Sequence, residues 1–149
     1  MRAIIQRVNS ASVAVEGKVV SSIGRGLLML VGFHKEDTVA DSDYIINKST
    51  GLRIFGDSDG MMNLSVSDIE GEILVVSQFT LYGDSRKGKR PSFSTSMPPA
   101  EAKLFYDDFI NRFRKSFSSL KSGVFAADME VSLVNSGPVT IILDSSKIL

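Results

Sequence analysis

Hydrophobic and polar positions along the chain form short runs that predict strands. Residues 3–8 form one such run, and residues 11–23 alternate on either side of Glu16-Gly17, which is typical of a hairpin. Residues 26–33 are continuously apolar between glycines, as in a central strand. Residues 53–66 predict a strand, a turn and a returning strand. We therefore expect strands to dominate the fold.

Two segments carry helix signals instead. Residues 38–50 begin with Thr38 and Asp41 at capping-box spacing and end before Gly51. A second helix opens at Pro98-Pro99. The phenylalanines that follow repeat every four residues: Phe105, Phe109, Phe113 and Phe117. This spacing makes one apolar stripe that must lie on the sheet, so we interpret the four rings as core.

Residues 73–83, "ILVVSQFTLYG", start as a buried strand and then change character. Residues 73–76 form the β-branched, apolar run of a strand covered on both faces, and we expect this strand to reach residue 82. Ser77, Gln78 and Thr80 nevertheless add three hydrogen-bonding side chains. A buried polar group left unpaired costs roughly 1–3 kcal/mol. The placement therefore requires either local pairing or a function.

The last part of the chain predicts two more strands. Met129, Val131 and Leu133 alternate with polar residues, and residues 139–143 are largely apolar. Between them, residues 135–138 are expected to form a turn, because a proline is excluded from central positions of a sheet. The whole pattern predicts a single domain over residues 1–149. Its fold class is α+β, a mostly antiparallel sheet curled toward a β-barrel with two flanking helices.

Composition narrows the possible chemistry. The 17 basic and 17 acidic side chains cancel, which argues against a protein coated with nucleic acid but allows a local basic patch. The chain has no cysteine, so thiol nucleophiles, disulfides and thiolate metal sites are excluded. Its one histidine, His34, is interpreted as a surface loop residue. No long apolar run predicts a signal peptide or a membrane span, and we expect a cytoplasmic protein.

The residues alone leave the candidate chemistry open. Ser77 and Thr80 are candidates for a nucleophile, for a ligand contact or for ordinary pairing at a strand end. A hydroxyl nucleophile needs a neighbouring base, and the chain offers only His34 or a lysine. No metal site is predicted, because the acidic turn at 57–60 lacks the other ligands of a calcium loop. The cations of the polar loop 83–97 fit either phosphate binding or plain solvation: Arg86, Lys87, Lys89 and Arg90.

Several motifs together resemble one family. "SQFTL" at 77–81 and "NSGPVT" at 135–140 are similar to the two signature motifs of the D-aminoacyl-tRNA deacylases. "IQRV" near the start, "RPSF" at 90–93 and "FAADMEVSLVN" at 125–135 match the same family in the same order. The resemblance covers essentially the whole chain. This sequence departs from the family pattern at Ser136, where many members carry an acidic residue.

The resemblance implies a homodimeric hydrolase with active sites at the subunit interface. Its substrate would be D-aminoacyl-tRNA, cleaved at the ester to the terminal adenosine without cofactor or metal. Gly137 and Pro138, joined by a cis peptide bond, would reach into the partner's site and exclude L-amino acids. Arg7 would brace this loop, and Gln78 would share that task.

The same resemblance assigns roles to the remaining candidates. The end of the strand, Ser77 to Thr80, would be the floor of the ester site, with backbone N–H groups around Phe79 stabilising the oxyanion. Phe125 and Met129 would bind the terminal adenosine, although core packing explains them equally well. The loop cations Arg86, Lys87, Lys89 and Arg90 would contact the acceptor stem.

Two alternatives belong to other classes. A non-catalytic module that binds tRNA or DNA ends would depend on the basic loop and not on Gly137 and Pro138. An unrelated serine or threonine esterase would depend on Ser77 or Thr80 and would need no RNA.

Overall fold

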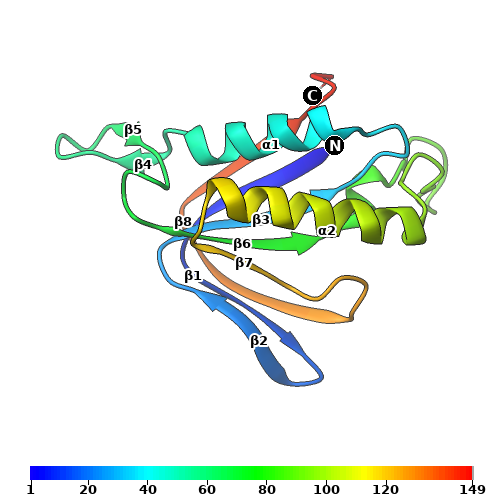
Figure 1. The fold of residues 1–149 in the computed structure, drawn as a ribbon, viewed down its shortest axis with the longest axis horizontal. Coiled ribbons are helices and arrows are strands. Elements are labelled where there is room, and N and C mark those ends of the chain that lie inside the picture. Colours follow the sequence, from blue (N-terminus) through cyan, green and yellow to red (C-terminus); the bar gives the residue numbers. More distant parts are fainter. Residues whose placement is uncertain (149) are drawn as a thin grey trace.

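The structure is a computed structural model that describes residues 1–148 (Figure 1). Its elements follow in the order β1 (Arg2–Val15), β2 (Lys18–Ile23), β3 (Gly26–Gly32), α1 (Val39–Gly51), β4 (Phe55–Gly56), β5 (Met62–Leu64), β6 (Glu72–Ser77), the short 3-10 helix η1 (Phe79–Tyr82), α2 (Pro99–Ser116), β7 (Leu120–Ser122) and β8 (Met129–Asp144). Both predicted helices are present, each within a residue or so of its expected start.

The main sheet is built around the long strand β1. Strands β2, β3 and β8 all pair with β1 in antiparallel fashion, whereas β3–β6 and β6–β7 are parallel pairs. The parallel pairs follow from the connections. Along the chain, α1 and the small β4–β5 hairpin connect β3 to β6, and α2 connects β6 to β7, so each connection is long enough to return to the same end of the sheet. The predicted class is confirmed: an α+β fold whose sheet is mixed and strongly curved.

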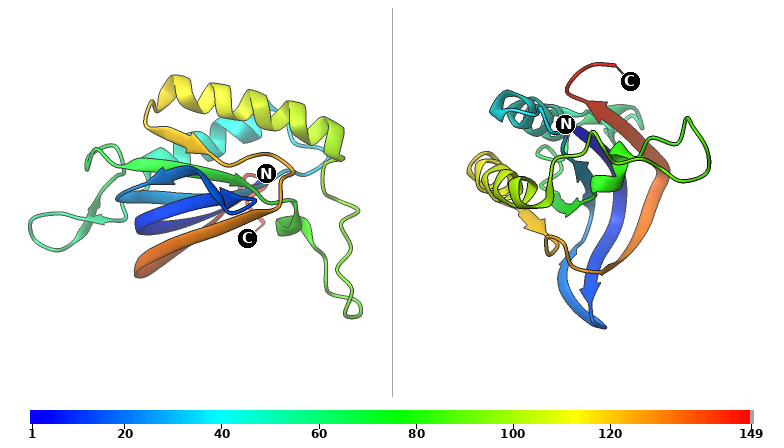
Figure 2. Two further views of the ribbon diagram at one scale, coloured as in Figure 1. Left: turned by 90° about the horizontal axis from the view of Figure 1, so that it is seen from below. Right: turned by 90° about the vertical axis from the view of Figure 1, so that its right-hand side faces the viewer.

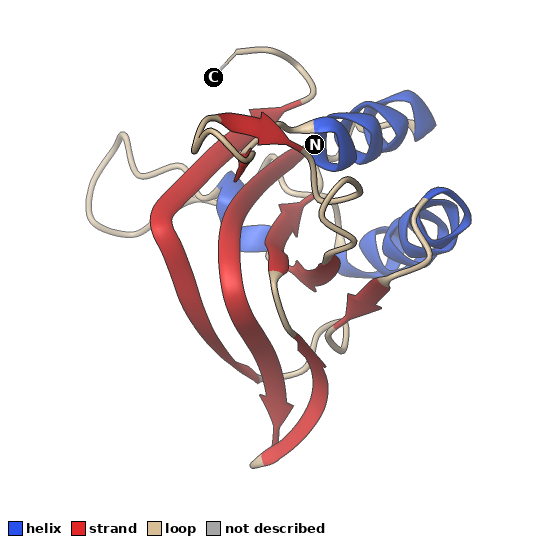
Figure 3. Cartoon of the chain, turned by 90° about the vertical axis from the view of Figure 1, so that its left-hand side faces the viewer, coloured by secondary structure: helices blue, strands red, loops and turns tan. Residues whose placement is uncertain are grey.

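The two helices cover one face of the curved sheet (Figure 3). Phe109 and Phe113 of α2 are fully buried against it, and Phe105 and Phe117 are partly buried at the same surface. The four-residue phenylalanine repeat is therefore core. Neither helix of the described chain is both long and apolar enough to cross a membrane.

Strand β6 ends at Ser77, five residues earlier than predicted. Its pairing with β3 stops at Val31↔Ser77, because β3 itself ends at Gly32. Gln78 N–H still donates to Val31 O at 2.6 Å, and the chain then bends into η1. The polar residues of "SQFTLYG" thus mark the point where the strand gives way to a tight turn.

The expected turn at 135–138 does not reverse the chain. Strand β8 runs through it, because β1 is long enough to pair with both halves of β8. Val8 pairs with Asn135 and Gln6 pairs with Thr140, so residues 136–139 bulge out opposite Arg7. The Gly137–Pro138 peptide bond in this bulge is cis, and Gly137 has a φ of 108°, which favours glycine.

Candidate active site

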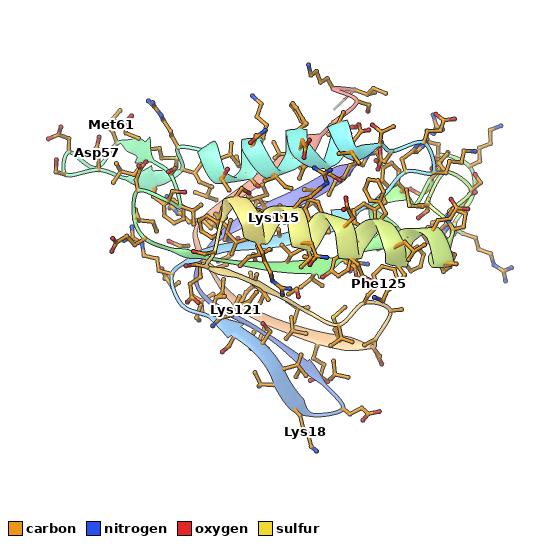
Figure 4. The ribbon with its side chains drawn as sticks, viewed as in Figure 1. Lys18, Asp57, Met61, Lys115, Lys121 and Phe125 are labelled. Atoms are coloured by element: carbon orange, nitrogen blue, oxygen red, sulfur yellow. The ribbon has the colours of Figure 1, made fainter. Side chains whose placement is uncertain are left out.

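A cavity of about 640 Å³ opens where β6 ends. Its walls come from β3, from η1, from the segment that leads into α2 and from the segment between β7 and β8. Five predicted site residues line it: Ser77, Gln78, Phe79, Phe125 and Met129. Figure 4 shows Phe125 beside α2, on the connection toward β8. The structure therefore places residues of the first motif in the same cavity as the two residues that were predicted to bind the terminal adenosine, although they lie some fifty positions apart in the sequence.

The backbone at the start of η1 has unused donors. Within residues 1–148, neither Phe79 N–H nor Thr80 N–H donates a hydrogen bond, whereas the N–H groups of Gln78 and Leu81 on either side do. The first N–H groups of a helical turn lack internal partners by construction. Phe79 lines the cavity and Thr80, the next residue, does not, so the pair of donors begins at the cavity wall.

The Thr80 side chain is placed poorly for nucleophilic attack. Its Oγ1 accepts a hydrogen bond from Gln78 Nε2 at 2.5 Å, and a carboxamide N–H cannot act as a base. His34 does not line the cavity; its Nδ1 accepts the Glu36 N–H at 3.2 Å and its ring lies near Tyr82. Thr80 therefore has neither of the partners that a triad requires.

Arg7 fixes the bulge of β8 through backbone oxygens. Its Nε donates to Ser136 O at 3.2 Å and its Nη1 donates to Ile54 O at 2.6 Å. A Cβ placed on Gly137 would lie 2.5 Å from Arg7 Nη2, so the guanidinium packs directly under the glycine. The side chain of Ser136 takes no part, so this bracing needs no particular residue at the position where many resembling proteins are acidic.

Asn135 is a positioning residue that the sequence did not single out. Its Nδ2 donates to Arg7 O and to Val139 O, both at 3.0 Å, and its Oδ1 accepts from Gln6 Nε2 at 3.1 Å. It thus closes the base of the bulge. The signal was available, because Asn135 opens the "NSGPVT" motif.

Gly137 and Pro138 are exposed and do not line the cavity of their own chain. The hydrogen bonds of the Gln78 side chain likewise go to Thr80 and not to the bulge. Within one chain the structure therefore does not bring the two motifs together; the resemblance joins them only across two subunits.

The predicted cations lie on a loop that projects from the body of the molecule (Figure 2). Arg86 is paired with Asp84, Nη2 to Oδ2 at 2.7 Å and Nε to Oδ1 at 2.9 Å. These hydrogen bonds lower the pKa of Asp84 to about 2. The other three, Lys87, Lys89 and Arg90, form no ion pair within the described chain.

Sequence reasoning also missed part of the cavity wall. Met97 and Ala102 line it together with Pro98 and Pro99 at the start of α2, and Phe93, which lies beside the basic loop, lines it as well. The two prolines indicate a helix start, but nothing in the linear pattern says that this start faces the end of β6. No group of three or more His, Cys, Asp or Glu side chains that would hold a metal occurs among residues 1–148.

Comparison with solved structures identifies the fold. The chain superposes on a structure named "Structural Analysis of a probable eukaryotic D-amino acid tRNA deacylase" with a TM-score of 0.80, 20% identity and 95% and 97% coverage of the two chains. At this identity the match shows the fold alone, which is α+β and of the deacylase type.

The family follows from sequence. The sequence-family model described as D-Tyr-tRNA(Tyr) deacylase matches residues 4–144, and the chain belongs to this family. A "D-aminoacyl-tRNA deacylase" of Thermotoga petrophila is 56% identical over 148 residues, and one of Thermosipho melanesiensis is 53% identical over 149, each with 99% coverage of both chains. The names of these relatives describe hydrolases of ester bonds. A structure named "c-Myc DNA Unwinding Element Binding Protein" matches with a TM-score of 0.92, 43% identity and 97% and 98% coverage.

Proposed function

We propose that this chain, as one domain over residues 1–149, hydrolyses the ester that joins a D-amino acid to the terminal adenosine of tRNA. Water adds across the ester bond and releases free D-amino acid and tRNA, in the cytoplasm and without cofactor or metal. Family membership over nearly the full length carries the proposal. The cavity at the end of β6 supports it, since its size suits a nucleoside with an attached aminoacyl group.

Catalysis in this proposal relies on backbone donors. The free N–H groups of Phe79 and Thr80 stabilise the oxyanion that forms when water attacks the ester carbonyl. In other enzymes, losing one such donor costs about 2.7–4 kcal/mol of transition-state stabilisation. Ser77 and Gln78 form the floor beside these donors, and the adenosine 2′-hydroxyl or water handles the proton.

Recognition of the D-configuration is assigned to the bulge of a second copy. Gly137 and Pro138 of one subunit enter the partner's cavity, where their carbonyls bind the α-amino group and fill the space of an L side chain. Two observations support this arrangement. Both residues are exposed and outside their own cavity. In addition, β8 pairs only with β1 among the described strands, and its exposed side chains include Leu133, Val134 and Ile142.

The adenosine end of tRNA binds the remaining wall. Phe125 packs against Tyr106 at 5.4 Å between ring centroids and also faces the cavity with Met129, so core packing and ligand contact coexist at this residue. The cations of the projecting loop, Lys87, Lys89 and Arg90 with Arg86, contact the acceptor stem through phosphates. Such contacts position the RNA without reading its sequence, which suits an enzyme that acts on many tRNAs.

The test compares hydrolysis of D-tyrosyl-tRNA and L-tyrosyl-tRNA by purified protein without added metal, with Pro138→Ala alongside. We expect rapid loss of the D ester only, and a weaker preference in the variant. Equal cleavage of both esters would overturn the role of the bulge. No cleavage of either by folded protein would overturn the proposed activity.

One alternative is a module that binds DNA or tRNA ends without catalysis, and the name of the 43% identical solved structure, a DNA-binding protein, favours it. That function depends on the projecting loop. Reversing the charges of Lys87 and Lys89 would then abolish binding, while Pro138→Ala would leave it intact. A D-specific ester hydrolysis that survives the charge reversal with a raised KM would exclude this alternative as the main function.

A further inference from the structure

Two aromatic side chains form an exposed pair at the mouth of the cavity. Phe79 of η1 is 58% exposed and Phe93 of the projecting loop is 37% exposed, and both line the cavity. Their ring centroids are 5.1 Å apart with an interplanar angle of 64°. Each ring therefore keeps a large apolar surface in water, which is unusual for a pair that already packs together.

The backbone holds Phe93 firmly in this position. Asp84 and Ser92 exchange two hydrogen bonds, at 2.8 and 2.9 Å, which close the loop just before Phe93. Phe93 O then accepts the Ser96 N–H at 3.0 Å. A Cβ on Gly83 would lie 3.0 Å from a ring carbon of Phe93, so the glycine allows the ring to approach η1 closely. Phe93 thus belongs to the anchored base of the loop and not to its tip.

The tip of the same loop supplies positive charge. Lys87, Lys89 and Arg90 lie within a few residues of the anchored base, and the loop extends away from the body of the molecule (Figure 2). An apolar aromatic surface next to unpaired cations is the combination that single-stranded RNA requires: the rings stack on bases and the cations neutralise phosphates.

We propose that the Phe79–Phe93 pair is a stacking site for the nucleobase that precedes the terminal adenosine of the bound RNA. The inference rests on the proposed function, which places the terminal adenosine in the cavity. The preceding nucleotide is joined to it by one phosphodiester link and must therefore lie at the cavity mouth. Stacking accepts any base, so the site orients the single strand without adding sequence specificity.

A double-mutant cycle between protein and RNA tests this subsite. The probe is an RNA hairpin with a single-stranded 3′ end that terminates in 3′-deoxy-3′-(D-tyrosylamino)adenosine, whose amide link resists hydrolysis. A second probe lacks only the base of the preceding nucleotide. Phe93→Ala is the test variant, because Phe93 is not assigned to the chemistry, and Phe93→Tyr is the control that retains the ring.

We expect Phe93→Ala to weaken binding of the complete probe by about 5- to 150-fold, the range measured for loss of one base–aromatic stack. The wild-type protein should bind the abasic probe about as weakly as Phe93→Ala binds the complete probe. For the abasic probe, Phe93→Ala should cause no further loss of affinity. Phe93→Tyr should bind the complete probe nearly as tightly as the wild type does.

Equal weakening of both probes by Phe93→Ala would overturn the proposal, because the ring would then act without the base. Loss of the dimer in Phe93→Ala, measured by sedimentation, would overturn it in favour of an interface between copies. Failure of the proposed function appears separately, as absence of D-tyrosyl-tRNA hydrolysis by the wild-type protein, because the cycle measures binding alone.

Discussion

Removing the Arg7 side chain tests whether the bulge of β8 must be braced. Arg7→Ala deletes two charged-donor hydrogen bonds, to Ser136 O at 3.2 Å and to Ile54 O at 2.6 Å. Hydrogen bonds to charged groups contribute about 1.5–3 kcal/mol each. Arg7 is partly exposed, so water replaces part of this, and we expect the free energy of unfolding to fall by about 1.5–3 kcal/mol in total.

The effect on activity should exceed the effect on folding. Without the guanidinium beneath Gly137, the bulge keeps the Asn135 contact to Val139 O at its base but loses the anchor at Ser136. Residues 136–138 then sample several positions, so the D-to-L ratio of kcat/KM should fall together with the rate. Hydrolysis of D- and L-tyrosyl-tRNA, and urea unfolding followed by circular dichroism, measure the two effects separately. Ile45→Val provides a control for lost stability alone: it removes a buried methyl group from α1, costs about 1 kcal/mol and leaves the bulge intact.

The reasoning fails if Arg7→Ala retains the wild-type D-to-L ratio under conditions where it remains folded. It fails equally if Ile45→Val lowers the ratio as much as Arg7→Ala does, since loss of stability alone would then explain the result. Arg7→Lys should lie between the wild type and Arg7→Ala, because a single ammonium cannot span both carbonyl oxygens with the geometry of a guanidinium.

Three further outcomes follow from the geometry. Thr80→Ala should retain kcat within about tenfold of wild type in a single-turnover assay, whereas loss of a true nucleophile lowers kcat by several orders of magnitude. Phe125→Leu should raise KM for D-tyrosyl-tRNA by about fivefold or more with a smaller change in kcat, because a stacking surface is lost from the binding step. In a carboxyl-carbon NMR titration, Asp84 should show a pKa of about 2 instead of the ordinary 3.8, and Arg86→Ala should bring it back toward 3.8. Because this pKa is lowered, the pairing of Asp84 with Arg86 is complete above about pH 4 and is lost as the pH falls toward 2.

Elements with strong local signals were predictable from the sequence. The α2 stripe is one such case, because a four-residue repeat of large rings leaves one packing solution on a sheet. Helix α1 is another: Asp41 accepts hydrogen bonds from both the N–H and the Oγ1 of Thr38, which ties down the first turn as the spacing implied. In both segments, residues close in sequence decide the outcome.

The errors arose where distant segments decide. Strand β6 ends at Ser77, where β3 ends beside it; the polar residues after Val76 are compatible with a strand end but do not by themselves set it. The "NSGP" segment has the composition of a turn. Strand β1 nevertheless pairs with β8 on both sides of this segment, so the chain continues in the same direction. The contact of Phe93 with Phe79 could not be predicted for the same reason, since it depends on how the loop folds back.

The parts of the site that carry its proposed chemistry are mostly backbone groups. The free N–H groups at the start of η1, the carbonyls of Gly137 and Pro138, and the Ser136 oxygen that Arg7 binds are main-chain atoms. Side chains such as Asn135 and Arg7 act mainly by holding that backbone in place. The proposed site is therefore compatible with a chain that has no cysteine, one histidine outside the cavity and a serine at position 136. The positions that should tolerate least change are therefore those that shape or brace the main chain, and a search for a conventional triad would overlook them.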